Sequence, residues 1–164
     1  MKILFLFVSA FILFQALDLK EVRVAYKEAA HDSAKVDGFY NSMLKVTKDD
    51  DVSLVAYKGA AIALKARQAQ TIKEKKEGFM EGVSFIEFAI EKAPSAIEPR
   101  FVRLGIQENT PKLLKYKEDI EEDKTMILNQ FETIDSPNLK GHIKDYILQS
   151  KVFTTEEKTV ISKL

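Results

Sequence analysis

The chain has 164 residues, in which 25 Lys and Arg side chains balance 25 Asp and Glu side chains, and it contains no cysteine. The neutral balance argues against binding to nucleic acid or to anionic lipid, since both require a basic face. The absence of cysteine from the sequence excludes disulfides, thiolate metal sites and a lipid attached through cysteine. At this length we expect one domain that is held together by packing alone.

Residues 1–16 have the features of a secretory signal peptide. Lys2 precedes an unbroken apolar run, residues 3–14, and the small residue Ala16 ends the segment. The run is shorter than the ~20 residues that a helix needs to span a bilayer. We therefore expect cleavage after residue 16 and an exported domain, residues 17–164, that is periplasmic or secreted and has no membrane attachment. An uncleaved anchor or a buried apolar helix is the alternative.

Capping residues and apolar spacing predict helices along the rest of the chain. Asp18 and Glu21 form a capping box that opens a helix over residues 19–31. A second stretch, residues 33–47, carries apolar side chains at 3- and 4-residue spacing. Together these two segments predict a first antiparallel helical hairpin.

A second hairpin is predicted over residues 52–70 and 76–93. The acidic turn that ends at Asp51 can cap its first helix. Residues 71–78 are rich in Lys and Glu, which indicates a solvated loop or an extra helical turn. The second helix has the strongest apolar face in the chain, and Pro94 ends it.

Four further signals divide the C-terminal part of the chain into helices. Ser95 and Glu98 form a capping box, Thr110 and Ser136 each stand directly before a proline, and Thr154 opens a short final helix. No stretch alternates apolar and polar residues over the length of a strand. We therefore predict an all-α fold of antiparallel helical hairpins, with about seven to eight helices.

Two short segments, residues 24–30 and 55–61, match at six of seven positions and lie 31 residues apart. A period between about 20 and 50 residues is typical of stacked helical units. The alternative is a chance match, because Ala and Lys are abundant in this chain.

The stretch from Ser53 to Pro94 resembles a tetratricopeptide unit, in which large and small residues alternate along two paired helices. The residues that carry the resemblance are Val55, Gly59, Ile62, Gly82, Ile86, Ala89 and Pro94. The chain is also similar, over residues 94–123, to small uncharacterised exported bacterial proteins built from such hairpins. The resemblance implies a tetratricopeptide-like solenoid or bundle and no particular activity. Here the unit is longer than the standard one by roughly 11 residues.

Enzyme motifs are weak in this sequence. Glu28 and His31 have the spacing of a carboxylate–histidine pair on one helical face, as in di-iron bundles, but Leu139 stands where a second copy would place a Glu before His142. With only two histidines in the chain, we do not expect a catalytic zinc site of the usual three-ligand kind. There is no nucleophile elbow and no glycine-rich phosphate loop. We expect no catalytic residues, no metal and no cofactor, and we expect His31 to be a polar helix-end residue.

Arg100, Arg103 and Gln107 form a polar stripe at one-turn spacing in a chain that has only four Arg among its 25 basic residues. Arg offers planar, bidentate donors that Lys cannot provide. If the helix over residues 97–108 folds back on the next one, Arg103 should meet Asp119 or Asp123. The stripe then either fixes the register of the hairpin or binds an anion or a peptide carboxylate.

Small side chains line one face of the first helix in each predicted hairpin, notably Ala56, Ala60 and Ala63. In tetratricopeptide-like arrays this face is concave, so these residues would leave a shallow apolar trough for a peptide. The alternative is that other helices fill the trough as core. The sequence thus favours an exported, non-catalytic module that binds a protein or peptide of the cell envelope. The alternative function is an enzyme or a small-anion-binding protein that uses the region around Arg100 and Arg103.

Overall fold

The computed structural model describes residues 17–164, and the predicted signal peptide, residues 1–16, lies outside the described residues. The α-helices are α1 (Leu19–His31), α2 (Val36–Ser42), α3 (Val52–Ala66), α4 (Ile72–Lys92), α5 (Ile97–Asn109), α6 (Ile120–Gln130), α7 (Pro137–Gln149) and α8 (Thr155–Lys163). Short 3₁₀ turns are η1 (Ser33–Lys35), η2 (Lys112–Leu114) and η3 (Phe131–Thr133). The predicted all-α fold is confirmed over these residues, which contain eight α-helices and no strand. Within residues 17–164, no helix has both the length and the apolar character that crossing a membrane requires.

α3 and α4 form the most extensive helix pair, and two glycines permit their close approach. A Cβ on Gly59 would lie 2.4 Å from the carbonyl oxygen of Gly82, and one on Gly82 would lie 2.5 Å from that of Gly59. Further along the pair, a Cβ on Gly78 would lie 2.8 Å from that of Ala66. Later residues of α3 thus meet earlier residues of α4, so the pair is antiparallel, as predicted.

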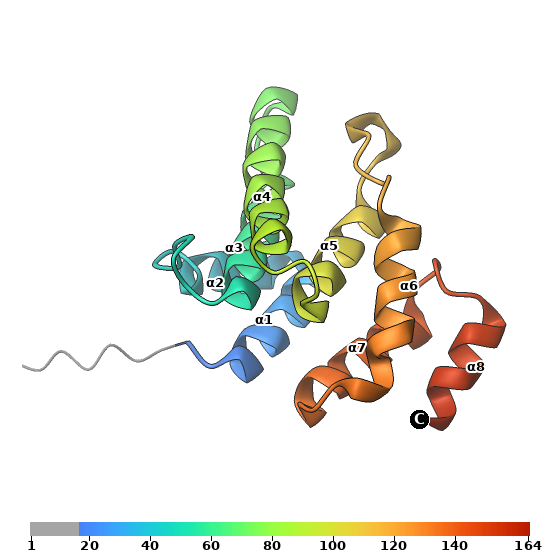
Figure 1. Ribbon diagram of the computed structural model, residues 1–164. Coiled ribbons are helices and arrows are strands. Elements are labelled where there is room, and N and C mark those ends of the chain that lie inside the picture. Colours follow the sequence, from blue (N-terminus) through green and yellow to red (C-terminus); the bar gives the residue numbers. More distant parts are fainter. Residues whose placement is uncertain (1–16) are drawn as a thin grey trace, which may run out of the picture.

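α5 is the central helix of the fold (Figure 1). It packs against α3 and α4 on one side and against α6 on the other. Phe101, Val102 and Leu104 are almost completely buried, so this helix carries apolar core residues around most of its circumference. α7 and α8 complete the C-terminal side, with α7 also reaching α1. Side chains from α1, α5 and α7 meet at Tyr26, Phe101 and His142.

The local capping predictions hold where the cap uses only short-range contacts. Asp18, Asp51, Ser136 and Thr154 each accept a hydrogen bond from a backbone N–H of the first turn that follows. Thr154 forms the full capping box, whereas Asp18 acts without a reciprocal bond from Glu21.

Two capping predictions are wrong. α5 begins after Ala96 with no side-chain cap, and Glu98 points into the core instead of back to Ser95. Thr110 ends α5, and its hydroxyl donates to the Ile106 carbonyl, while the proline after it precedes only the 3₁₀ turn η2. Glu98 is bound instead by Arg23 of α1, whereas the Thr110 hydroxyl bonds to a carbonyl one turn back in its own helix.

The ends of α2 and α3 and the start of α4 differ from the predicted helix limits. Residues 71–78 form an extra stretch of helix, not a loop, because Thr71 and Glu74 make a capping box that starts α4 at Ile72. α2 ends at Ser42, several residues before the predicted limit of 47, and α3 ends at Ala66 instead of residue 70. The long α4 therefore accounts for the unusual length of this hairpin.

The alanines of the predicted trough lie in the core. Ala56 and Ala60 are completely buried, and Ala63 is 3% exposed. The reason is that α3 packs against α1, α2, α4 and α5, so other helices cover the faces on which these alanines lie. The three residues are core positions in this structure and offer no surface to a partner.

Candidate functional site

The predicted Arg103–carboxylate contact is confirmed between α5 and α6. Arg103 binds Asp123 through two parallel bonds, Nε to Oδ2 and Nη2 to Oδ1, each 2.7 Å long. The Asp123 side chain is completely shielded from water, and that of Arg103 is 6% exposed. This bidentate geometry is what guanidinium provides and ammonium does not.

Acidic side chains surround both arginines of the stripe. We call Arg100, Arg103, Gln107 and these acids the α5–α6 cluster. Arg100 donates to Glu122 and, over 3.0 Å, to Asp123. Nη1 of Arg103 lies 3.0 Å from Glu87 and 3.3 Å from Asp119. Completing the cluster, the buried Gln107 amide donates to Asp119 over 3.1 Å.

Two guanidinium groups here face four carboxylates, so the cluster has excess negative charge. An incoming anion would have to displace a carboxylate that is already bound to Arg103. The contacts instead join residues at mirrored distances from the turn, Arg103 to Asp123 and Gln107 to Asp119. This arrangement supports the register-fixing interpretation of the stripe.

A different site lies between α1 and α7, where the structure has a groove with a volume of about 690 Å³. We call it the α1–α7 groove. Its lining residues are Arg23, Val24, Lys27, Glu28 and His31 from α1, and Pro137, Asn138, Gly141, His142 and Asp145 from α7.

Arg23, which lines the α1–α7 groove, belongs to a buried polar triad with Glu98 and Tyr57, which do not line it. Arg23 makes a bidentate contact with Glu98 of α5, with bonds of 2.7 and 2.8 Å, and Tyr57 of α3 donates to the same carboxylate over 2.9 Å. Burial, with the neighbouring Glu98 charge, raises the pKa of Tyr57 well above its ordinary value, so its hydroxyl stays a donor. Arg23 also donates to the Asn138 amide oxygen over 3.0 Å. Because that oxygen faces Arg23, the Asn138 NH₂ group, which can only donate, lies on the other side of the planar amide.

His142 forms part of one wall of the groove and is wedged between aromatic rings. Its imidazole lies edge-on to Phe101 and Tyr26, with ring centroids 5.1 and 6.3 Å away. Its Nε2 atom is buried and has no hydrogen-bond partner. Burial, together with the charge of Lys27, lowers the pKa of His142 to about 4, so the ring is neutral at pH 7.

The rim of the groove is polar and accessible to solvent. Lys27 pairs with Asp145 over 2.7 Å, and both side chains are about half exposed. His31 lies at the C-terminal end of α1, as expected, and its Nδ1 is 2.8 Å from the Lys27 carbonyl. A carbonyl can only accept, so Nδ1 carries the proton and Nε2 faces away from the helix.

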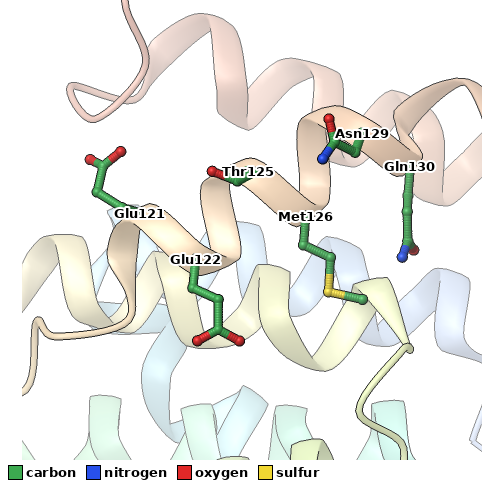
Figure 2. A pocket seen from close by; sticks show the side chains of 6 residues that line it. All are labelled: Glu121, Glu122, Thr125, Met126, Asn129 and Gln130. Carbon is green, nitrogen blue, oxygen red and sulfur yellow. The ribbon is translucent and has the colours of Figure 1, made fainter.

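A second depression, with a volume of about 570 Å³, lies over α6 and is lined by Glu121, Glu122, Thr125, Met126, Asn129 and Gln130. Figure 2 shows that these side chains come from one helix and point to different sides of it. They do not converge on a common point, so this surface has the features of an exposed helix face rather than of a site.

Glu28 and His31, the carboxylate–histidine pair with the spacing of a metal motif, both line the α1–α7 groove. Among residues 17–164, no group of three or more His, Cys, Asp or Glu side chains is placed to hold a metal ion. Glu28 instead lies 4.0 Å from Lys35 in an exposed ion pair.

The sequence did not point to Arg23, Glu98 or His142. One usable signal was present: Arg23 is one of only four arginines and stands between Val22 and Tyr26, on the apolar stripe of its helix. Such a position indicates a buried guanidinium that requires a carboxylate partner. The identity of that partner, 75 residues away in the chain, could come only from the fold.

No protein-family model, no curated protein and no solved structure matches this chain. Its class is therefore defined by what the described residues show: an all-α domain with a polar groove between its first helix and its seventh.

Proposed function

We propose that the protein is a non-catalytic binding module that holds a peptide segment of a partner protein in the α1–α7 groove. The proposed location is the cell envelope, because the N-terminal sequence predicts export. The tetratricopeptide-like resemblance of residues 53–94 supports a binding role but does not bear on this groove directly.

The proposal rests on one observation: the groove combines hydrogen-bond donors, hydrogen-bond acceptors and apolar surface. Donors such as the Asn138 amide and acceptors such as Glu28 line the same groove, and Val24, which is 52% exposed, adds an apolar surface. A peptide backbone presents both donors and acceptors along its length, so it can use both kinds of group. A small anion would instead meet the carboxylates of Glu28 and Asp145.

The pairing of the polar groups also supports binding over chemistry. Arg23, Glu98 and Tyr57 are hydrogen-bonded to one another, and Lys27 and Asp145 are paired at the rim. Side chains that act on a substrate have to converge on an open point within hydrogen-bond reach of the reacting atoms. In this groove these charged groups bind one another and do not converge on such a point.

A blocking substitution tests the proposal, because Gly141 lies in the groove and a Cβ added there meets nothing within 4 Å. Peptides selected from a random display library on the purified protein should bind the wild type and lose at least ~10-fold in affinity with Gly141→Trp. The matched control is Gly38→Trp, since Gly38 on α2 is equally open and lies outside the groove. Peptides that bind Gly141→Trp as tightly as the wild type, or a selection that yields no binder, would overturn the proposal.

A further inference from the structure

We infer that protonation of His142 opens the α1–α7 groove, so that acid regulates access to this surface. The consequence for binding rests on the proposed function, whereas the opening itself can be measured without a partner.

The first observation is the position of the imidazole. Phe101 and Tyr26 enclose the His142 ring edge-on, and its buried Nε2 has no hydrogen-bond partner. In a neutral ring one nitrogen carries no proton, so this arrangement is tolerated. In the imidazolium both nitrogens are N–H donors. A proton on Nε2 would then be a buried charged donor without an acceptor, which the closed structure disfavours.

The second observation is the set of charges around the ring. On α1, Arg23 and Lys27 are cationic and oppose a further positive charge. The anions are Glu98 on α5 and Asp145 on α7, but Arg23 and Tyr57 hold Glu98, and Lys27 holds Asp145. The other ionisable side chains that line the groove are Glu28 and His31. The closed groove thus offers the imidazolium no uncommitted carboxylate among its nearest charges, which agrees with the lowered pKa of His142.

The third observation is that α7 is held unevenly. Towards α1 its polar contacts are that of Asn138 with Arg23 and the half-exposed pair of Asp145 with Lys27, and the His142 ring lies edge-on to Tyr26. At its other end the carboxylate of Glu108 accepts three hydrogen bonds, two from the last turn of α7 and its C-cap and one from the backbone N–H that follows. The half-exposed Lys27–Asp145 pair contributes little to stability, and one Asn138 bond remains against three bonds to Glu108, so the α1 side is the weaker polar attachment. Acid should therefore release the N-terminal half of α7 from α1 while its C-terminal end stays anchored.

Hydrogen exchange of the full protein measures this opening. If the pKa of His142 is about 4 when closed and near its ordinary 6.5 when open, the opening constant of the N-terminal half of α7 should rise about 20-fold from pH 7 to pH 5, after correction for intrinsic exchange. His142→Phe, which keeps an aromatic ring and removes the titrating group, should abolish the rise. The matched control, His31→Gln, changes the other histidine of the groove and should leave the rise intact.

An equal rise in His142→Phe, or no rise in the wild type, would overturn the inference. Proton NMR titration of wild-type His142 gives a second measurement that needs no variant, and a midpoint near 6.5 in the folded protein would also overturn it. Peptide binding separates the two proposals. Acid-dependent opening without any peptide binder contradicts only the proposed function, whereas binding with the same pH dependence in wild type and His142→Phe contradicts only this inference.

Discussion

Replacing Arg103 with Ala tests whether the α5–α6 cluster stabilises the packing of these two helices. The substitution removes both 2.7 Å bonds to Asp123 and leaves that carboxylate completely buried. Breaking a buried ion pair from one side typically costs 3–5 kcal/mol. Arg100 keeps its 3.0 Å contact with the same carboxylate, which places the expected loss at the lower end, about 3 kcal/mol. The contacts that Arg103 loses with Glu87 and Asp119 add little, because these acids are more than a third exposed.

Urea unfolding followed by far-UV circular dichroism measures this loss as a lower midpoint at unchanged slope. The matched variant is the double substitution Arg103→Met with Asp123→Leu, which removes both charges and keeps apolar volume. It should recover stability to within about 1 kcal/mol of the wild type, because no charge is left buried without a partner. A loss below about 1 kcal/mol in Arg103→Ala, or a double variant as unstable as the single one, would refute the reasoning.

Three further predictions follow from the helix packing and from the buried imidazole. Gly59→Ala should destabilise the protein by about 2 kcal/mol, because its Cβ would lie 2.4 Å from the Gly82 carbonyl oxygen and force α3 and α4 apart; an unchanged thermal midpoint would contradict the close packing. Gly141→Ala and Gly38→Ala should each stabilise by about 0.5–1 kcal/mol in urea unfolding, since both sites are helical and open, and a loss at either would show a contact that the structure lacks. Stability should fall as the pH drops from about 6.5 to about 4, because the unfolded chain protonates His142 before the folded one does. The total contribution of this group is about 3 kcal/mol, and the decline should be correspondingly shallower in His142→Phe.

Part of the candidate chemistry could be predicted because it depends on short chain distances. Arg103 and Asp123 lie equally far from one turn, and an antiparallel helical hairpin brings such residues opposite each other. The groove could not be predicted in this way, because Arg23 and Asn138 are 115 residues apart and meet only when α7 returns to α1. The role of Glu98 was wrongly predicted for the same reason. Its spacing from Ser95 indicates a helix cap, but in the structure it is buried and bound to Arg23, which is distant in the chain.

The sequence by itself determined the helices, because apolar spacing and caps such as Asp18, Ser136 and Thr154 act within one or two turns of the chain. Glycines at compatible positions also anticipated the close α3–α4 hairpin. Only the tertiary structure decided which helix faces remain open. α3 is surrounded by four helices, which turns Ala60 from a possible lining into core. α7, by contrast, meets α1 through a few polar contacts and one ring contact and leaves a groove, since the side chains that the two helices turn toward each other there are mostly polar.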